Sequence, residues 1–425
     1  MERSEYMTKK ILFLNIIIIM SIFSTACWNA MELNTLGITL VIGLDFEEDK
    51  ILLTAEIIEP VPAKEKSSMK RGSTVTYVQG IGENIFDAFR DITLKFDRKL
   101  YIAHNKVIIL GEEFARKASV TDLDLLVRDH EQRETAYLLI AKGSKAYEVM
   151  GVASGLEEIP GNYIFKLIEN FKYNPKVVKV NIAEYLRHFY DMGQQPVLGI
   201  ITKKEKMKIN KIEKSNEGKE YELTVIGGAA FDKEKLVGFL DGSETKAFNI
   251  IMGRIKTGII TFPTPNIIDT NSSETMSVES DIKSEETPGI DMSTVDIIKM
   301  KTKKNVDIIN GNIVLKMEVK LRGSLEEVTK NIDISKEDNI KKMEVTCSKE
   351  IETYIKNTVS KVQNEFESDI FGFGSAFHRK YPKEWHKVKH NWNDIFSKAD
   401  FQVKVETKLI RTGLTNTPIG RIKGR

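Results

Sequence analysis

The alternation of apolar and polar positions along this chain predicts β-strands, and apolar residues at helical spacing predict helices between them. Residues 36–46 and 51–58 both alternate and flank a polar turn, so they predict a β-hairpin. Further strands are expected at 74–79, 106–110, 135–141, 197–202, 223–231 and 235–240. Helices are expected at 83–93, around 123–129, and at 160–170, 182–190 and 247–252. The mixture of strands and helices indicates an α/β fold.

The last third of the chain has the clearest pattern. Strands are expected at 293–300 and 305–309, and strict alternation over 312–322 predicts a sheet with one buried face. Apolar residues then recur three and four apart from Ile351 to Ile370, which is typical of a long amphipathic helix. We expect this helix to cover the sheet and to stop at Gly372 and Gly374 before a last strand at 401–410.

These patterns predict an α/β fold of mixed α+β type behind an N-terminal lipoprotein signal peptide, and the composition supplies core material for two or three domains. The predicted segments are a signal peptide at 1–26, an N-terminal domain at 27–200, a middle domain at 201–268, a flexible loop at 269–291 and a C-terminal domain at 292–425. The loop is expected because its residues are rich in Ser, Thr and Glu and almost free of apolar side chains.

The first residues have the layout of a secretion signal, whether translation starts at Met1 or at Met7. Lys9 and Lys10 precede the apolar run 11–23, and small residues lead to Cys27. A cysteine in this place can carry a diacylglyceryl group after cleavage, although Ser24 replaces the Leu, Val or Ile usual three residues before it. The alternative is an uncleaved signal anchor with Cys27 as an ordinary thiol. Both alternatives tether the body outside the membrane.

Composition and charge narrow the classes of partner. The chain has 425 residues and a formal net charge of +2, so the strong basic excess typical of nucleic-acid binding is missing and no nucleic-acid partner is expected. The chain has 2 cysteines. If Cys27 is lipidated, Cys347 has no partner, and no disulfide is expected.

Few residues are candidates for catalysis or for binding a ligand, and we expect no catalytic residue, metal or cofactor. His104 lies beside a strand without a nucleophile or carboxylate at motif spacing, and Arg128 and Asp129 form part of an expected structural ion-pair set. His378, His386 and His390 lie within thirteen residues, but the nearby Glu384 points away from the face that His386 and His390 would share. The glycines at 372 and 374 lack the third glycine of a dinucleotide fingerprint. The basic cluster at 379–389 is either a solvated face or a contact for anionic headgroups, and Trp385 and Trp392 are expected in the core.

Five blocks of sequence together resemble the Ger(x)C family, the lipoprotein C-subunits of endospore germinant receptors. The first block begins at the lipidated cysteine and matches at Cys27, Trp28 and Glu32, with Asn29 and Met31 departing from the family pattern. The next blocks match at His104, Lys106 and Gly111, at Arg128 and Asp129, and over 228–240. The last block matches at Asp369, Gly372, Gly374, His378, Arg379, Tyr381, Pro382, Trp385 and Trp392.

The resemblance implies a three-domain α/β body. It would serve as a non-catalytic, lipid-anchored receptor subunit at the cell membrane, on the outer face of the spore inner membrane. Its implied partners are the membrane, through the N-terminal diacylglyceryl anchor, a multi-spanning receptor subunit and a second membrane subunit. The implied role is in nutrient-triggered germination, and the sequence does not decide whether this chain contacts the germinant. A solute-binding lipoprotein of an importer is the main alternative, and a surface hydrolase is a more distant one.

Overall fold

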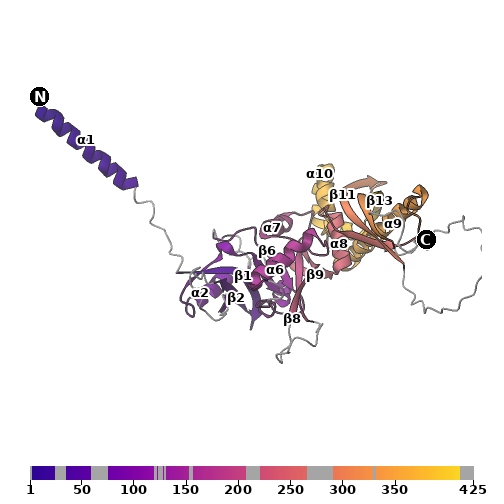
Figure 1. Ribbon diagram of the computed structural model, residues 1–425, viewed down its shortest axis with the longest axis horizontal. Helices are drawn as coiled ribbons and strands as arrows, with labels where there is room; N and C mark the ends of the chain where they lie inside the picture. The colour runs from indigo at the N-terminus through magenta and orange to yellow at the C-terminus, as the bar shows by residue number, and fades with distance from the viewer. Residues whose placement is uncertain are drawn as a thin grey trace, which may run out of the picture.

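The computed structural model describes residues 2–23, 35–58, 75–118, 122, 128, 131–152, 157–206, 221–265, 291–328 and 332–411. Cys27, Trp28, Glu32 and Asp129, the expected helix near 123–129 and the expected loop at 269–291 lie outside these ranges, apart from the isolated Arg128 and Asp291 at the loop's end. The described residues form two sheets with helices packed on them, as Figure 1 shows. The predicted mixed α/β fold is confirmed.

The larger sheet has nine strands, eight of them in the order β3-β2-β1-β5-β6-β7-β8-β9, with β4 paired to β1. Its strands are β1 (Leu36–Glu47), β2 (Lys50–Ile58), β3 (Val75–Gly82), β4 (Lys99–Tyr101), β5 (Val107–Gly111), β6 (Tyr137–Ala141), β7 (Val197–Glu205), β8 (Tyr221–Asp232) and β9 (Lys235–Leu240). The predicted hairpin is β1–β2, which pair antiparallel with Phe46 opposite Ile51. The strands β1, β5, β6 and β7 run parallel, so the centre of this sheet is buried on both faces.

Both faces of the larger sheet pack against helices. Val41 belongs to one buried cluster and its neighbour Ile42 to another, because successive side chains of a strand point to opposite faces. The Ile42 side includes residues of α2 (Ile85–Ile92), α3 (Glu112–Lys117) and α7 (Ile182–Tyr190). The Val41 side includes residues of α5 (Ala146–Val149) and α6 (Pro160–Glu169).

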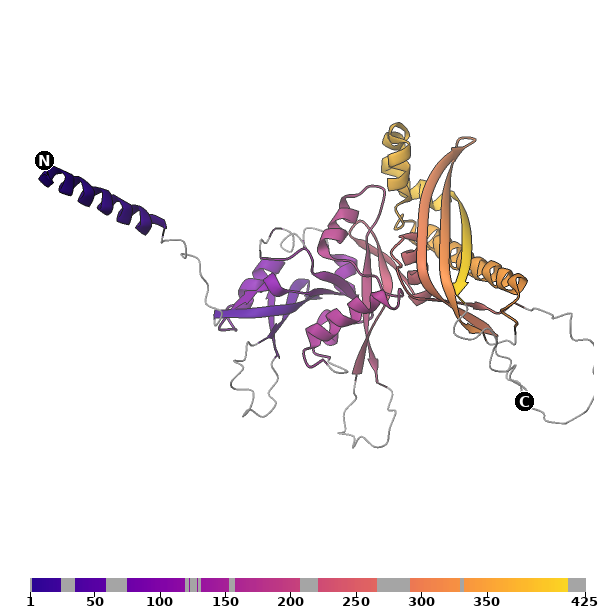
Figure 2. The same ribbon diagram turned by 45° about the horizontal axis from the view of Figure 1, so that its top comes forward.

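The smaller sheet has the order β10-β11-β12-β13. Its strands are β10 (Ile259–Pro263), β11 (Met292–Ile309), β12 (Asn312–Val328) and β13 (Asp400–Arg411). The long helix α9 (Glu337–Lys361) packs along β13 and β10, and Figure 2 shows it beside the three long strands. The expected sheet covered by a long amphipathic helix is therefore confirmed.

Three local expectations in the last third are wrong. The two strands expected at 293–300 and 305–309 are one strand, β11, whose register shifts between Ile297 and Lys299. The long helix does not run to Ile370: α9 passes into a π-helical turn at Val362–Phe366, and Glu367 then takes the left-handed conformation with φ 49°. Gly372 does not stop this helix, because it lies at the start of the next one, α10 (Phe373–Lys380).

The remaining helices are α8 (Gly242–Ile251), α11 (Pro382–Val388), α12 (Trp392–Lys398) and the N-terminal α1 (Glu2–Phe23). Helix α8 contacts β8 of the larger sheet, and β11 and α9 of the smaller part, so it lies between the two sheets. Within the described residues, no helix combines the length and the apolar character needed to cross a bilayer.

The expected domain boundaries do not coincide with the edges of the sheets. Strand β7 spans residue 200, β8 and β9 extend the larger sheet beyond it, and β10 joins the smaller sheet. One buried cluster also runs from the larger sheet to the smaller one. The division into three domains, with a middle domain at 201–268, stays a prediction.

Candidate functional site at the junction of the two sheets

The carboxylate of Asp369 organises the turn that joins α9 to α10. Its Oδ1 accepts hydrogen bonds from the backbone N–H groups of Phe371 at 3.1 Å and Gly372 at 2.8 Å. Its Oδ2 accepts from the N–H of Gly374 at 2.7 Å and from the indole Nε1–H of Trp392 at 2.8 Å. Burial raises the pKa of Asp369, and these donors and the nearby Lys304 oppose that rise. The carboxylate thus satisfies four buried donors at once.

This turn, called here the Asp369 turn (residues 368–374), is docked against the loop that follows α7 in the larger part. The N–H of Gln195 donates to the carbonyl of Asp369 at 2.8 Å. Beside the turn, Ser375 donates its N–H to the carbonyl of Gly193 at 3.1 Å and its hydroxyl to Asp191 at 2.7 Å. These bonds link segments more than 170 residues apart, so they fix the smaller sheet against the larger one.

Two glycines of the last resemblance block are explained by this docking. Gly374 lies so close to the backbone of Gly193 that an added Cβ would sit 2.6 Å from the Gly193 Cα and 2.6 Å from the Trp392 Nε1. Gly372 has φ +75°, a conformation that side-chain-bearing residues rarely adopt. Gly374 thus allows two backbone segments to pack closely, and Gly372 allows the chain to adopt a positive φ at the start of α10.

The aromatic residues of the same block pack together beside the Asp369 turn. The rings of Phe377 and Trp392 stack with centroids 5.5 Å apart, and Trp385 meets Trp392 edge to face at 5.5 Å. Trp385 and Trp392 are buried, which confirms their expected place in the core. His378 stacks on Trp385 at 5.5 Å, and Tyr381 contacts Phe377.

The last block is therefore brought together by the fold, with some members at the surface. His378, Arg379 and Pro382 are exposed, and Pro382 begins α11. The two histidines expected on one helix are separated, because α11 ends at Val388 and His390 lies in the following 3-10 turn. Across the described residues, no group of three or more His, Cys, Asp or Glu side chains has the arrangement of a metal site.

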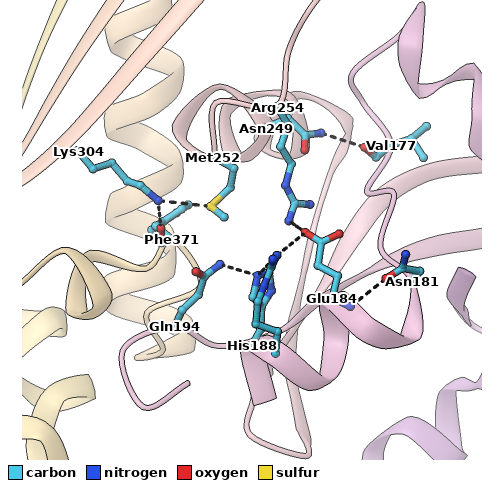
Figure 3. A network of polar contacts seen from close by, with 11 residues as sticks. Val177, Asn181, Glu184, His188, Gln194, Asn249, Met252, Arg254, Lys304 and Phe371 are labelled. Atoms are coloured by element: carbon cyan, nitrogen blue, oxygen red, sulfur yellow. Dashed lines mark hydrogen bonds and ion pairs between the residues drawn. The ribbon is translucent and has the colours of Figure 1, made fainter. Parts of the chain in front are cut away.

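A polar network continues the junction between α7, α8 and β11, and Figure 3 shows its side chains facing one another. Glu184 of α7 forms an ion pair with Arg254, which follows α8. Asn249 of α8 donates to the carbonyl oxygens of Pro175 at 2.8 Å and Val177 at 2.9 Å. These contacts tie α8 to the larger part.

On the side of the smaller sheet, Lys304 of β11 donates to the carbonyl of Phe371 and contacts the sulfur of Met252 at 3.7 Å. Burial, together with Arg379 and Arg254, lowers the pKa of Lys304 to about 8, and Asp369 opposes that shift. Lys304 thus connects β11 to the Asp369 turn while remaining near a compensating carboxylate.

His188 of α7 lies inside this network, and its surroundings favour the neutral form of the imidazole. Burial, with Arg254 and Arg187 nearby, lowers the pKa of His188 from its ordinary 6.5 to about 4, and Asp191 opposes the shift. The Nε2 atom of His188 lies 3.4 Å from Gln194 Nε2 and 3.5 Å from Arg187 Nη2. Since both of these partners are donors, Nε2 is the acceptor and the ring proton is on Nδ1.

We expect this neutral histidine to make stability depend on pH. Between pH 6.5 and about 4 the unfolded chain takes up a proton on residue 188 that the folded chain refuses, so the free energy of unfolding falls as the pH falls. The expected difference between pH 7 and pH 4 is about 2–3 kcal/mol from this group. Urea unfolding of the wild type and of His188→Gln at both values measures it. An equal loss of stability in both proteins would contradict the assignment.

The matched residues of the second and third blocks that the structure describes lie outside the Asp369 turn. Lys106 donates to Asn162 Oδ1 at 2.7 Å, and its ammonium lies 5.3 Å from the Phe165 ring centroid. His104 meets the ring of Tyr101 edge to face at 5.8 Å. Gly111 leaves room for the buried carboxylate of Asp45, whose Oδ1 accepts from the N–H of Ala146 at 2.7 Å. Arg128 is exposed.

Sequence reasoning missed the partners of the Asp369 turn in the larger part. Nothing in the sequence singles out Asp191, Gly193 and Gln195, which follow α7, or the pair of Glu184 and Arg254. No local pattern marks any of them, because their partners lie far away in the sequence. The polar groups of the junction accordingly bind one another and connect the two sheets, although Asn249 Oδ1 and Arg254 Nη1 are buried without a hydrogen-bond partner among the described residues.

Comparison with known proteins gives this arrangement a class. A family model described as "Spore germination protein N-terminal domain" matches residues 29–203, and one described as "Spore germination B3/ GerAC like, C-terminal" matches residues 226–413. Both models describe spore germination proteins, and they match this chain with the N-terminal domain first and the C-terminal domain second. The chain belongs to the GerAC-like family of spore germination proteins.

Relatives from Bacillus subtilis (strain 168) align over nearly the whole chain. Spore germination protein KC is 26% identical over 97% of this chain and 98% of its own length. Spore germination protein B3 is 26% identical over 91% of this chain and 94% of its own length. A crystal structure of the GerBC protein has a TM-score of 0.51 at 23% identity, over 87% of this chain and 97% of that one, and supports the fold.

Proposed function

We propose that this chain is a lipid-anchored, non-catalytic subunit of a spore germinant receptor, needed for the nutrient-triggered germination response. The observation that carries the proposal is the match of both family models, in order, across nearly the whole length of named spore germination proteins. The proposed partners are a multi-spanning receptor subunit and a second membrane subunit. The proposed location is the outer face of the spore inner membrane.

The rigid junction supports a role in binding other proteins. The buried carboxylate of Asp369 is occupied by four internal donors, and Arg254 is paired with Glu184. A rigid two-sheet body presents fixed surfaces, and fixed surfaces lower the entropy lost on binding a partner. The importer alternative requires two similar lobes, and the described sheets differ in strand number and order.

The proposed anchor is a diacylglyceryl group on Cys27. Two acyl chains hold a protein stably on a bilayer, since each buried methylene contributes about 0.8 kcal/mol. A tether of this kind confines the body to a thin layer at the membrane and raises its effective concentration near membrane partners.

Cys27→Ala is expected to abolish labelling of the protein by a palmitate analogue and to impair germination with nutrients. The matched control is Cys347→Ala, because Cys347 is buried in the fold and is not a candidate for acylation. That control should keep its label. Normal labelling, membrane retention and germination of the Cys27→Ala strain would contradict the proposed anchor, whereas loss of label with a normal germination response would contradict its importance.

A further inference from the structure

Much of the outward face of the smaller sheet is basic. On β12, the side chains of Met317, Val319 and Leu321 point inward and are buried with residues of α9, so Glu318, Lys320 and Arg322 point outward and are exposed. The same alternation applies to β11 and β13. Figure 2 shows these three long strands as one curved layer.

The pairing register places like charges next to one another on this face. Across the strands, Lys299 is opposite Arg322 and Arg322 is opposite Lys408. The next two outward rows are Lys301–Lys320–Glu406 and Lys303–Glu318–Lys404, and a fourth is Asn305–Lys316–Gln402. We call these twelve residues the lysine face. It holds seven lysines and one arginine against two glutamates, a net charge of +6.

This concentration of charge is local. The whole chain has a formal net charge of +2, so the remaining residues together are acidic. Like charges directly opposite one another destabilise a sheet, and the Lys299–Arg322–Lys408 row has three cations in succession. Lys320 is 3.4 Å from Glu406, Lys316 is 3.0 Å from Asp307 and Lys408 is 3.8 Å from Glu344 of α9, so the repulsion is relieved in part. An anionic surface outside the protein would complement the rest.

We propose that the lysine face binds the anionic lipid headgroups of a membrane. Lysine is a strongly hydrated point charge on a long stem, which suits diffuse attraction to a charged surface. The twelve positions contain no aromatic residue. Stacking on bases and the central anchors of protein interfaces both rely on aromatic side chains and arginine, so nucleic acid and a protein partner fit this face less well.

The row after Asn305–Lys316–Gln402 is Asp307–Val314–Asp400, and apolar side chains lie beyond it at this end of the sheet. Ile308 and Ile309 are each 40% exposed where β11 turns into β12. Isoleucines beside a lysine-rich surface can enter the boundary between headgroups and acyl chains. This electrostatic contact lies on the smaller sheet and does not include Cys27, so it adds a second point of attachment to the proposed lipid anchor and is testable apart from it.

The test uses the full chain bound to vesicles, with a fluorophore on a single introduced cysteine. Lys303→Cys places the probe on the lysine face. Lys356→Cys places it at an exposed position of α9, the helix that packs on the other face of the sheet. Vesicles contain phosphatidylcholine alone or with phosphatidylglycerol, plus a lipid whose headgroup carries a nitroxide quencher. We expect at least twofold quenching at position 303 in the anionic vesicles, reversed by high salt, and little quenching at position 356.

A charge-matched pair of variants completes the test. Lys299→Glu, Lys301→Glu and Lys320→Glu together should reduce quenching at position 303 to its level in neutral vesicles. Lys342→Glu, Lys349→Glu and Lys356→Glu together change the same charge on exposed positions of α9 and should leave that quenching unchanged. Thermal unfolding of both triple variants checks that they fold.

Flotation and quenching together distinguish the lysine-face contact from the lipid anchor on Cys27. Flotation on both kinds of vesicle without quenching at position 303 supports the anchor and overturns the lysine-face contact. Flotation only on anionic vesicles, with salt-sensitive quenching at 303, supports the contact without the anchor. Equal quenching at 303 and 356, quenching that survives the lysine-face triple variant, or no flotation at all overturns the contact, and an acidic protein or nucleic acid then becomes the partner to seek.

Discussion

Asp369→Ala is expected to destabilise the protein by about 3–5 kcal/mol, because it leaves several buried donors without an acceptor. The donors are the N–H groups of Phe371, Gly372 and Gly374 and the indole N–H of Trp392. None of them reaches water in the folded state by a small movement, since the turn is buried at the junction. Urea unfolding followed by tryptophan fluorescence measures the loss.

Two further variants sharpen this prediction. Asp369→Asn keeps an acceptor at Oδ1 but turns an N–H₂ group toward the donors of Gly374 and Trp392, so it should recover little of the lost stability. Asp296→Ala removes an exposed aspartate from β11 and should change stability by about 0.5 kcal/mol or less. A change below about 1 kcal/mol for Asp369→Ala would mean that the four donors find other partners.

The regular elements were predictable because their patterns are local. Strict alternation over β12 and the three-and-four spacing in α9 each reflect burial on one face of a single element. The ends were less predictable, since the π-helical turn at Val362–Phe366 and the left-handed Glu367 arise where the chain docks on the larger part. A bulge likewise let β11 continue where the sequence predicted two strands.

Only the half of the candidate site that belongs to the Asp369 turn was predictable from the sequence. The resemblance picked out Asp369, Gly374 and Trp392, and the structure brings these three together. Their partners Gly193 and Gln195 come from a loop in the other part of the chain and carry no periodic signal. Pairing between distant segments depends on how two sheets meet, and an alternating or helical pattern does not record it. The same holds for the lysine face, which emerges only when the strand register is known.

The close contact between Gly374 and Gly193 leads to the second large effect. We expect Gly374→Ala to cost about 3 kcal/mol or more, because its methyl group would meet the backbone of Gly193 and the Trp392 indole at 2.6 Å. Gly193 cannot move away without straining the bond from the Ser375 N–H to its carbonyl, and Trp392 cannot move without breaking its bond to Asp369. Gly193→Ala should act similarly from the opposite side of the same contact.

The double variant and a glycine elsewhere give the decisive comparison. Gly193→Ala with Gly374→Ala should cost less than the sum of the two single changes, because the first methyl group already forces the segments apart. Gly37→Ala is the matched control, since its methyl group would meet side chains and no backbone: the edge of the Phe96 ring at 2.8 Å and a methyl group of Ile57 at 3.4 Å. Side chains can shift, so this change should cost about 1 kcal/mol or less. Thermal unfolding of all four proteins measures this. Strictly additive losses, or a Gly374→Ala protein as stable as Gly37→Ala, would show that the two sheets are not held together at this contact, and the rigid-body argument for a partner-binding subunit would lose its structural basis.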